Sequence, residues 1–378
     1  MRIIKKYVGL ENLVDYIIDN RGKTVPTSDN GIPLIATNCI KHSSIYPTFE
    51  NIRYVSPEVY NSWFRAHLKP NDILFVNKGT PGRVCVVPNP VEFCAAQDMV
   101  GLRFKDIVDY RYMLAVLRSD EIQKTIANNH VGLVIPHFRK QELVKLKLPV
   151  VDRNLQRQIG KLYFDISNKI EINNRVNSEL ESMAKALYNY WFLQFDFPNE
   201  NGRPYKSAGG KMEYNENLRR QIPEGWEMKA IDFYADIIDP HPSHRAPTEV
   251  VDGFPFAGIG DINEWGNIDL NKARVINEEF VLKQERDYSI NEHSIGYGRV
   301  GTVGKVVKLR KQKFRYALSP TMAIINPKEG GFPSFVYFTV KNPIFLEWVK
   351  KYTSGSTRPA IGIQHLRVIP VIKPKTYK

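Results

Sequence analysis

Residues 296–303 read Gly-Tyr-Gly-Arg-Val-Gly-Thr-Val, a glycine spacing that can bind the phosphates of a nucleotide. In a dinucleotide site the third glycine opens a helix, and in a protein kinase an HRD-type loop and a DFG follow. Here residues 303–308 continue as a β-branched run typical of a strand, and neither kinase motif occurs downstream. The segment therefore predicts a glycine-rich hairpin, and a nucleotide-binding enzyme that uses residues 296–303 is the alternative.

Other residues suited to catalysis or metal binding do not form a recognisable site. His241 and His244 lack further ligands at metal-binding spacing, and Cys39, Cys85 and Cys94 match no zinc motif. The sequence has no Gly-x-Ser-x-Gly elbow and no Asn-Pro-Pro-Tyr-like motif for methylating a base. We therefore predict no catalytic residue and no metal site in this chain, and three buried structural thiols.

Basic and hydrogen-bonding side chains gather instead in glycine-rich segments. Arg, Lys, Asn and Gln are the residue types that hold phosphate oxygens and read the edges of purines. The chain carries 53 Lys+Arg against 40 Asp+Glu, a formal charge of +13, which favours a polyanionic partner. We predict contacts with double-stranded DNA from both halves of the chain, at Lys41, His42, Lys78, Thr80, Arg83, His137, Arg139, His244, Arg245, Arg299, Thr302, Lys305, Arg358 and Gln364.

The composition limits the class of protein that can position these residues. A chain of 378 residues with 43% hydrophobic residues suffices for two ordinary domains. No window approaches 18 consecutive apolar residues, and the N-terminal Met-Arg-Ile-Ile-Lys-Lys lacks the apolar stretch of a signal peptide. An odd number of cysteines suits a reducing compartment. These features predict a soluble, cytoplasmic protein.

An internal repeat organises the chain. Four pairs of positions keep nearly one register, at offsets of 221 to 223 residues: Gly31 with Gly253, residues 79–84 with 301–306, Met99 with Met322, and Pro149 with Pro370. Each copy contains short β-branched or aromatic runs bounded by Gly, Pro or Asn, which predict strands, and one helical stretch, at 110–119 and at 343–351. We expect two homologous α+β domains, at 1–151 and 226–378.

A different pattern separates the copies. Residues 152–193 contain no proline, and their apolar residues recur at steps of four and three, which predicts a long helix with a coiled-coil seam, broken by polar Lys169 and Asn173. We expect this spacer helix at 152–198, with Asp152 as its N-cap, and an exposed linker at 199–225. Such a seam needs a partner helix, and we predict that it packs through Leu155, Ile159, Leu162, Ile166, Val176, Leu180, Met183 and Leu187.

The order of these features resembles the specificity subunit of type I restriction-modification systems. The resemblance covers nearly the whole chain. It rests on the helix between the repeats and on three paired features, namely the Gly-x-Pro openings at 31–33 and 253–255, the Gly-Thr-x-Gly hairpins at 79–82 and 301–304, and the closing segments at 131–149 and 354–370. It implies two target-recognition domains that each read one half of a split DNA sequence. It also implies that adenine methylation and cleavage belong to partner chains.

Further expectations follow from this resemblance. The chain itself is expected to hold no cofactor, while S-adenosylmethionine, ATP and Mg serve the partner methyltransferase and restriction/translocase subunits. The family carries a second spacer helix after its second recognition domain, whereas this sequence ends at Lys378 without one. Another molecule, either a second copy or a methyltransferase subunit, is then expected to supply the helix. A truncated, non-functional specificity chain is the remaining interpretation.

Overall fold

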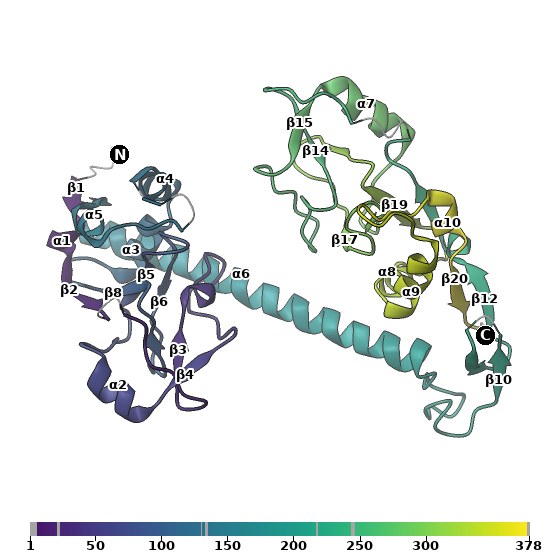
Figure 1. Cartoon of the computed structure of the whole chain (residues 1–378), viewed down its shortest axis with the longest axis horizontal. Helices are drawn as coiled ribbons and strands as arrows, with labels where there is room; N and C mark the ends of the chain where they lie inside the picture. Colours follow the sequence, from purple (N-terminus) through teal and green to yellow (C-terminus); the bar gives the residue numbers. More distant parts are fainter. Residues whose placement is uncertain are drawn as a thin grey trace. The chain divides into compact units, whose positions relative to one another are not determined.

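The computed structural model describes residues 6–20, 23–129, 131–132, 135–216, 218–242 and 246–375. The chain divides into two compact units, residues 1–180 and 181–378, and the boundary falls within one long helix, α6 (Arg153–Tyr188) (Figure 1). None of the helices in the described ranges is long and apolar enough to cross a membrane.

The first unit is built from three small sheets. An antiparallel sheet has the order β2-β8-β5-β6, a second has the order β4-β3-β7 with β3 and β7 parallel, and β1 pairs with β9. The strands are β1 (Lys6–Gly9), β2 (Val14–Asp19), β3 (Ile32–Ile35), β4 (Arg53–Val55), β5 (Ile73–Val76), β6 (Val84–Val86), β7 (Cys94–Ala95), β8 (Met99–Phe104) and β9 (Lys147–Val150). All four residues of β5 are buried, because both faces of this apolar run are covered.

Helices cover these sheets. They are α1 (Leu10–Leu13), the 3₁₀ turn η1 (Thr37–Cys39), α2 (Pro57–Trp63), α3 (Tyr110–Leu117), α4 (Asp120–Asn129) and α5 (Lys140–Lys145). Ser56 and Asp109 begin α2 and α3 as N-caps, since their side chains accept backbone N–H groups of the first turn. The apolar faces of α3 and α4 meet β5 and β8 in one core. Cys39, Cys85 and Cys94 are buried free thiols, and burial raises the pKa of Cys94 to about 12.

The second unit repeats this topology strand for strand. Its sheets have the orders β13-β19-β16-β17 and β15-β14-β18, with β14 and β18 parallel, and β12 pairs with β20. The elements are β12 (Glu227–Ala230), η3 (Ile231–Phe233), β13 (Ala235–Ile238), β14 (Phe254–Ala257), β15 (Arg274–Ile276), α7 (Glu278–Asp287), β16 (Ile295–Gly298), β17 (Val306–Lys308), β18 (Ala317–Leu318), β19 (Met322–Pro327), α8 (Pro333–Val340), α9 (Pro343–Tyr352), α10 (Ile363–Arg367) and β20 (Pro370–Lys373). The predicted fold, two homologous α+β units joined by a long helix, is confirmed.

Two details of the predicted repeat are wrong. Lys147 pairs with Gly9 at the end of one ladder, and Pro370 pairs with Ala230 at the same place in the other, so the counterpart of Pro370 is Lys147 and not Pro149. Each unit also has three helices after its β8 or β19 strand, where the sequence predicted one. Helix α8 was not predicted because its own side chains are apolar on nearly all sides. Its sequence therefore lacks the periodic alternation of apolar and polar residues on which the helix prediction depended.

Helix α6 contains 36 residues, and at 1.5 Å per residue it is about 54 Å long. Asp152 is its N-cap, as predicted, because Oδ1 accepts the N–H groups of Asn154 and Leu155 at 3.1 and 3.0 Å. A Cβ at Gly160 would lie 2.6 Å from the backbone nitrogen of Tyr112, so glycine permits close packing of α6 against α3. The first three turns of α6 therefore belong to the core of the first unit.

The segment after α6 contains a hairpin that its composition did not predict, although most described residues between 199 and 225 are exposed. A π-helical turn, η2 (Asn189–Leu193), leads to a hairpin of β10 (Met212–Asn215) and β11 (Arg220–Pro223). Phe195, Phe197 and Trp226 are buried there, and Phe197 stacks on Tyr205 and Trp226 with ring centroids 4.7 and 4.9 Å apart. These aromatic side chains supply enough apolar area to fold a segment otherwise rich in Asn, Gly and Ser.

Candidate nucleic-acid interface

In the first unit, the turn between β5 and β6 lies against the closing segment of the repeat. We call residues 77–83 the first hairpin tip. Gly79 N donates to the carbonyl of Pro136 at 2.9 Å, and Phe138 N donates to the carbonyl of Asn77 at 2.8 Å. Gly79 has a φ of 87°, which disfavours a side chain at this position. The structure thus brings together two segments that the sequence predicted to contact DNA.

The second unit builds the same arrangement. We call residues 299–305, between β16 and β17, the second hairpin tip. Gly301 N donates to the carbonyl of Pro359 at 2.8 Å, and Ile361 N donates to the carbonyl of Arg299 at 2.9 Å. Gly301 also has a positive φ, of 74°. Both units therefore hold a glycine-rich tip against their closing segment through equivalent main-chain hydrogen bonds.

The first tip presents positive charge. Lys78 and Arg139 are exposed, while Arg83 and His137 are half-buried beside them. No ion pair in the described part of the chain involves Lys78, Arg83 or Arg139. Thr80 is also half-buried, and its hydroxyl oxygen has no hydrogen-bond partner in the structure. Three cations at this tip are therefore available to bind an anion.

Lys41 and His42 belong to the loop that follows η1. Lys41 forms an ion pair with Glu50, so its charge is balanced within the loop. Partial burial, with positive Arg118 and Arg83 nearby, lowers the pKa of His42 below its ordinary value of about 6.5. Its imidazole is consequently neutral at pH 7 and contributes hydrogen bonds rather than charge.

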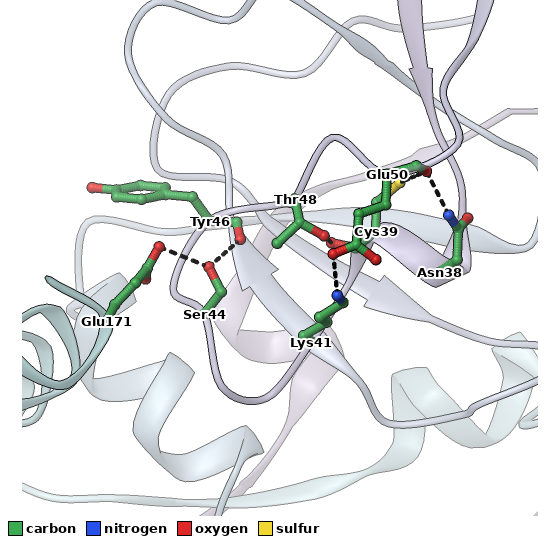
Figure 2. A network of polar contacts seen from close by, with 8 residues as sticks. All are labelled: Asn38, Cys39, Lys41, Ser44, Tyr46, Thr48, Glu50 and Glu171. Atoms are coloured by element: carbon green, nitrogen blue, oxygen red, sulfur yellow. Dashed lines mark hydrogen bonds and ion pairs between the residues drawn. The ribbon is translucent and has the colours of Figure 1, made fainter. Parts of the chain in front are cut away.

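Glu171 of α6 positions this loop (Figure 2). Its carboxylate accepts the hydroxyl of Ser44 and the backbone N–H of Ile45, both at 3.1 Å. On another side of the loop, the guanidinium of Arg118 donates to the carbonyls of Lys41 and Val84 at 3.3 and 2.8 Å. The loop is thus fixed to the spacer helix and to the β6 strand that leaves the first tip.

We expect Glu171→Gln to lower the free energy of unfolding by about 1–2 kcal/mol, because the amide leaves one backbone donor without its acceptor. Thermal denaturation followed by circular dichroism measures the change. Glu179→Gln, at an exposed position of the same helix whose carboxylate is only 3.9 Å from Arg175, is the control and should change stability by less than about 0.5 kcal/mol. Equal effects of the two variants would contradict the role assigned to Glu171.

The predicted residues of the second unit divide into two groups. Arg299 is only 6% exposed and donates to Asp239 at 2.8 Å, and Lys305 Nζ donates to the carbonyls of Ile259 and Ile262 at 2.8 and 3.2 Å. These two cations support the second tip from within the protein. By contrast, Thr302, Arg358 and Gln364 are exposed. Two further predicted residues, His244 and Arg245, lie outside the described residues.

The glycine pattern at 296–303 has a structural explanation. Strands β16 and β17 pair antiparallel, so residues 296–303 form a hairpin, as predicted, instead of the strand-to-helix turn of a dinucleotide site. A Cβ at Gly298 would lie 2.2 Å from the carbonyl oxygen of Thr302. The spacing is accounted for by close backbone approach, without a nucleotide. Within the described residues, no group of three or more His, Cys, Asp or Glu side chains could hold a metal ion.

We expect Gly298→Val to destabilise the second unit by about 3 kcal/mol or more, because the new side chain must displace backbone atoms. Differential scanning calorimetry measures this loss. Calorimetric titration of the wild-type chain with ATP and with NAD should give no binding heat. Tight binding of either nucleotide to the wild type would revive the alternative of a nucleotide-binding enzyme.

A second basic segment escaped the sequence analysis. Residues 308–315 contain five cations, and Arg310, Lys311 and Lys313 are exposed on the connection between β17 and β18. The run of Lys and Arg was the available signal. It was missed because the predicted residues were taken from glycine-rich segments, and this connection contains no glycine.

The chain is similar in sequence to known proteins. A family model described as the type I restriction modification DNA specificity domain matches residues 13–182. The type I restriction enzyme MjaIX specificity subunit of Methanocaldococcus jannaschii is 22% identical over 306 residues, which cover 80% of this chain and 67% of the relative. The HindI specificity subunit of Haemophilus influenzae is 24% identical over 347 residues, with 77% and 73% of the two chains covered.

A solved structure shares the fold. The S subunit of a type I restriction-modification system from M. genitalium superimposes with a TM-score of 0.50 and 15% identity, over 98% of this chain and 85% of the other. Residues 13–182 thus match a DNA specificity domain of type I restriction-modification systems. The chain as a whole is similar in sequence to type I specificity subunits and shares its fold with one of them.

Proposed function

We propose that the chain reads duplex DNA through two corresponding surfaces, each formed by a hairpin tip and its closing segment, and so recognises a site in two parts. The observation that carries the proposal is the duplicated arrangement, in which equivalent main-chain hydrogen bonds fix both tips. In the first unit the tip exposes Lys78 with Arg83 and Arg139 beside it, and in the second Arg358 is exposed next to the tip. Arg and Lys are suited both to phosphate oxygens and to guanine edges.

The proposal assigns the chemistry to other subunits. The chain would direct adenine methylation or cleavage that methyltransferase and restriction/translocase subunits carry out with S-adenosylmethionine, ATP and Mg. The spacer helix supports a docking role, because Leu162, Val176, Leu180 and Met183 are between 43% and 67% exposed along one side of α6. A helix with an exposed apolar stripe lowers its free energy by packing against another helix.

Adenine methylation profiling of cells with and without the gene tests the proposal. We expect one bipartite methylated sequence to disappear with the gene. A gel-shift assay of the purified chain with methyltransferase subunits should then show preference for a duplex carrying that sequence. Binding that is independent of sequence, or methylation that does not change, would overturn the proposal. Failure to co-purify with methyltransferase subunits, despite correct folding, would favour a non-functional specificity chain.

A further inference from the structure

The connection between β17 and β18 carries unbalanced positive charge. We call residues 309–316 the basic loop. Arg315 is balanced, since its guanidinium forms ion pairs with Glu278 and Glu285 of α7 at 2.7 and 2.5 Å. Arg310, Lys311 and Lys313 are exposed, and none of them forms an ion pair with any residue that the structure describes. The loop therefore displays three cations that the protein itself does not neutralise.

Specific contacts give the basic loop a defined shape. Gln312 Nε2 donates to the carbonyl of Gly266 at 2.8 Å, and the Tyr316 hydroxyl donates to the carbonyl of Arg310 at 2.8 Å. Gln312, Phe314 and Tyr316 are half-buried, whereas Lys311 and Lys313 between them are exposed. This alternation turns the uncharged side chains toward the protein and the cations toward solvent. The cations are thus presented by a supported loop, which lowers the entropic cost of binding a partner.

The first unit has no equivalent of this loop. Its β6 and β7 are joined by residues 87–93, which read Val-Pro-Asn-Pro-Val-Glu-Phe and contain no cation. At the hairpin tips, the first unit has more unpaired cations. Lys78 corresponds to Val300, and Arg139 corresponds to Gly362, the N-cap of α10. Arg83 corresponds to Lys305, which is bonded within the protein. The first unit therefore presents three cations at its hairpin tip, whereas the second unit presents Arg358 beside its tip and three more cations on the basic loop.

Strand β17 separates the basic loop from the second hairpin tip, since Lys308 at the end of β17 pairs with Ile295 at the start of β16. Arg310 follows Lys305 by five residues, which span at most about 17 Å when extended. Successive base pairs are about 3.4 Å apart, so the tip and the basic loop fall within the length of about five base pairs. A duplex read by the tip would bring its phosphates within reach of the basic loop.

We propose that Arg310, Lys311 and Lys313 bind backbone phosphates of the duplex beside the half-site read by the second unit, an attachment that the first unit makes through its hairpin tip instead. The inference rests on the proposed DNA reading and adds the residues that hold the backbone in the second unit. Phosphate contacts of this kind position the protein and raise its affinity without selecting a sequence.

The test compares the salt dependence of DNA binding. The full chain, assembled with methyltransferase subunits, is titrated onto a fluorescent duplex of random sequence at several salt concentrations. Arg310→Gln, Lys311→Gln and Lys313→Gln are combined in one variant. Its slope of log affinity against log salt should be shallower by up to about 2.7, since each phosphate contact contributes about 0.9, and its affinity at 0.1 M salt should fall at least about tenfold.

The matched control replaces Lys211, Lys350 and Lys375, which are exposed in the same unit, with glutamine and removes the same charge. Its slope should change by much less. An unchanged slope in the loop variant, or an equal change in the control, would overturn the inference while the proposed function stands. Loss of subunit assembly with an unchanged slope would overturn it in favour of a protein-binding loop. If the wild-type assembly does not bind the duplex, the proposed function itself fails.

Discussion

Combined replacement of Lys78, Arg83 and Arg139 with glutamine is expected to weaken duplex binding by on the order of a hundredfold at 0.1 M salt. These side chains are the unpaired cations at the first hairpin tip, and the tip is held by backbone hydrogen bonds that the substitutions leave in place. The loss should therefore occur without a change in melting temperature. Fluorescence anisotropy with the assembled complex measures the affinity, and circular dichroism measures the stability.

The control for this variant removes three charges elsewhere in the first unit. Lys69 precedes β5 and Lys105 follows β8, so both lie at the other end of the sheet from the tip, and Lys6 is exposed on β1. Their combined replacement with glutamine should change the affinity only slightly. If both triple variants weaken binding equally, net charge and not the first tip determines affinity.

The double substitution Val176→Glu and Leu180→Glu is expected to abolish assembly with partner subunits while leaving the isolated chain folded. The two side chains are 43% and 55% exposed, so the chain alone does not depend on their burial. A helix packed on them would have to bury two unpaired carboxylates, which costs several kcal/mol. Size-exclusion chromatography with light scattering measures assembly with methyltransferase subunits, or of the chain with itself.

The matched control is Asn174→Glu with Ser178→Glu, which places two carboxylates at the same spacing on a polar side of α6. Assembly should survive in this variant. If the stripe variant also assembles normally, the apolar stripe is not a docking surface. If its melting temperature falls steeply, the stripe contributes to the stability of the chain itself.

Much of the fold could be predicted because glycine and proline mark corresponding turns in both halves. The register of 222 residues between Gly31 and Gly253 is preserved in the structure, where β3 and β14 follow these glycines. Helix α6 was predictable from its period and from the N-cap at Asp152. The folding of residues 195–226 was not, because it depends on aromatic contacts between residues distant in sequence, such as Phe195 and Trp226.

The candidate site was predictable only in part. The sequence placed candidate DNA-contacting residues in the hairpin tip and the closing segment of each repeat, but it did not predict that the two segments lie against each other. Whether a given cation faces solvent or an internal acceptor could not be predicted, since Arg299 and Lys305 are bonded to Asp239 and to Ile259 from other strands and loops. Sequence alone shows the type of a side chain and not its partner in space.

The main-chain bonds that seat both tips have an evolutionary consequence. Because Gly79 and Gly301 are anchored through peptide groups, residues around them can be exchanged without loss of the scaffold. If these positions contact bases as proposed, substitutions there would change the preferred DNA sequence while the protein still folds. Because main-chain groups hold the tips and side chains would contact DNA, selection acts largely separately on folding and on recognition. Single substitutions then suffice to diversify the target sequences.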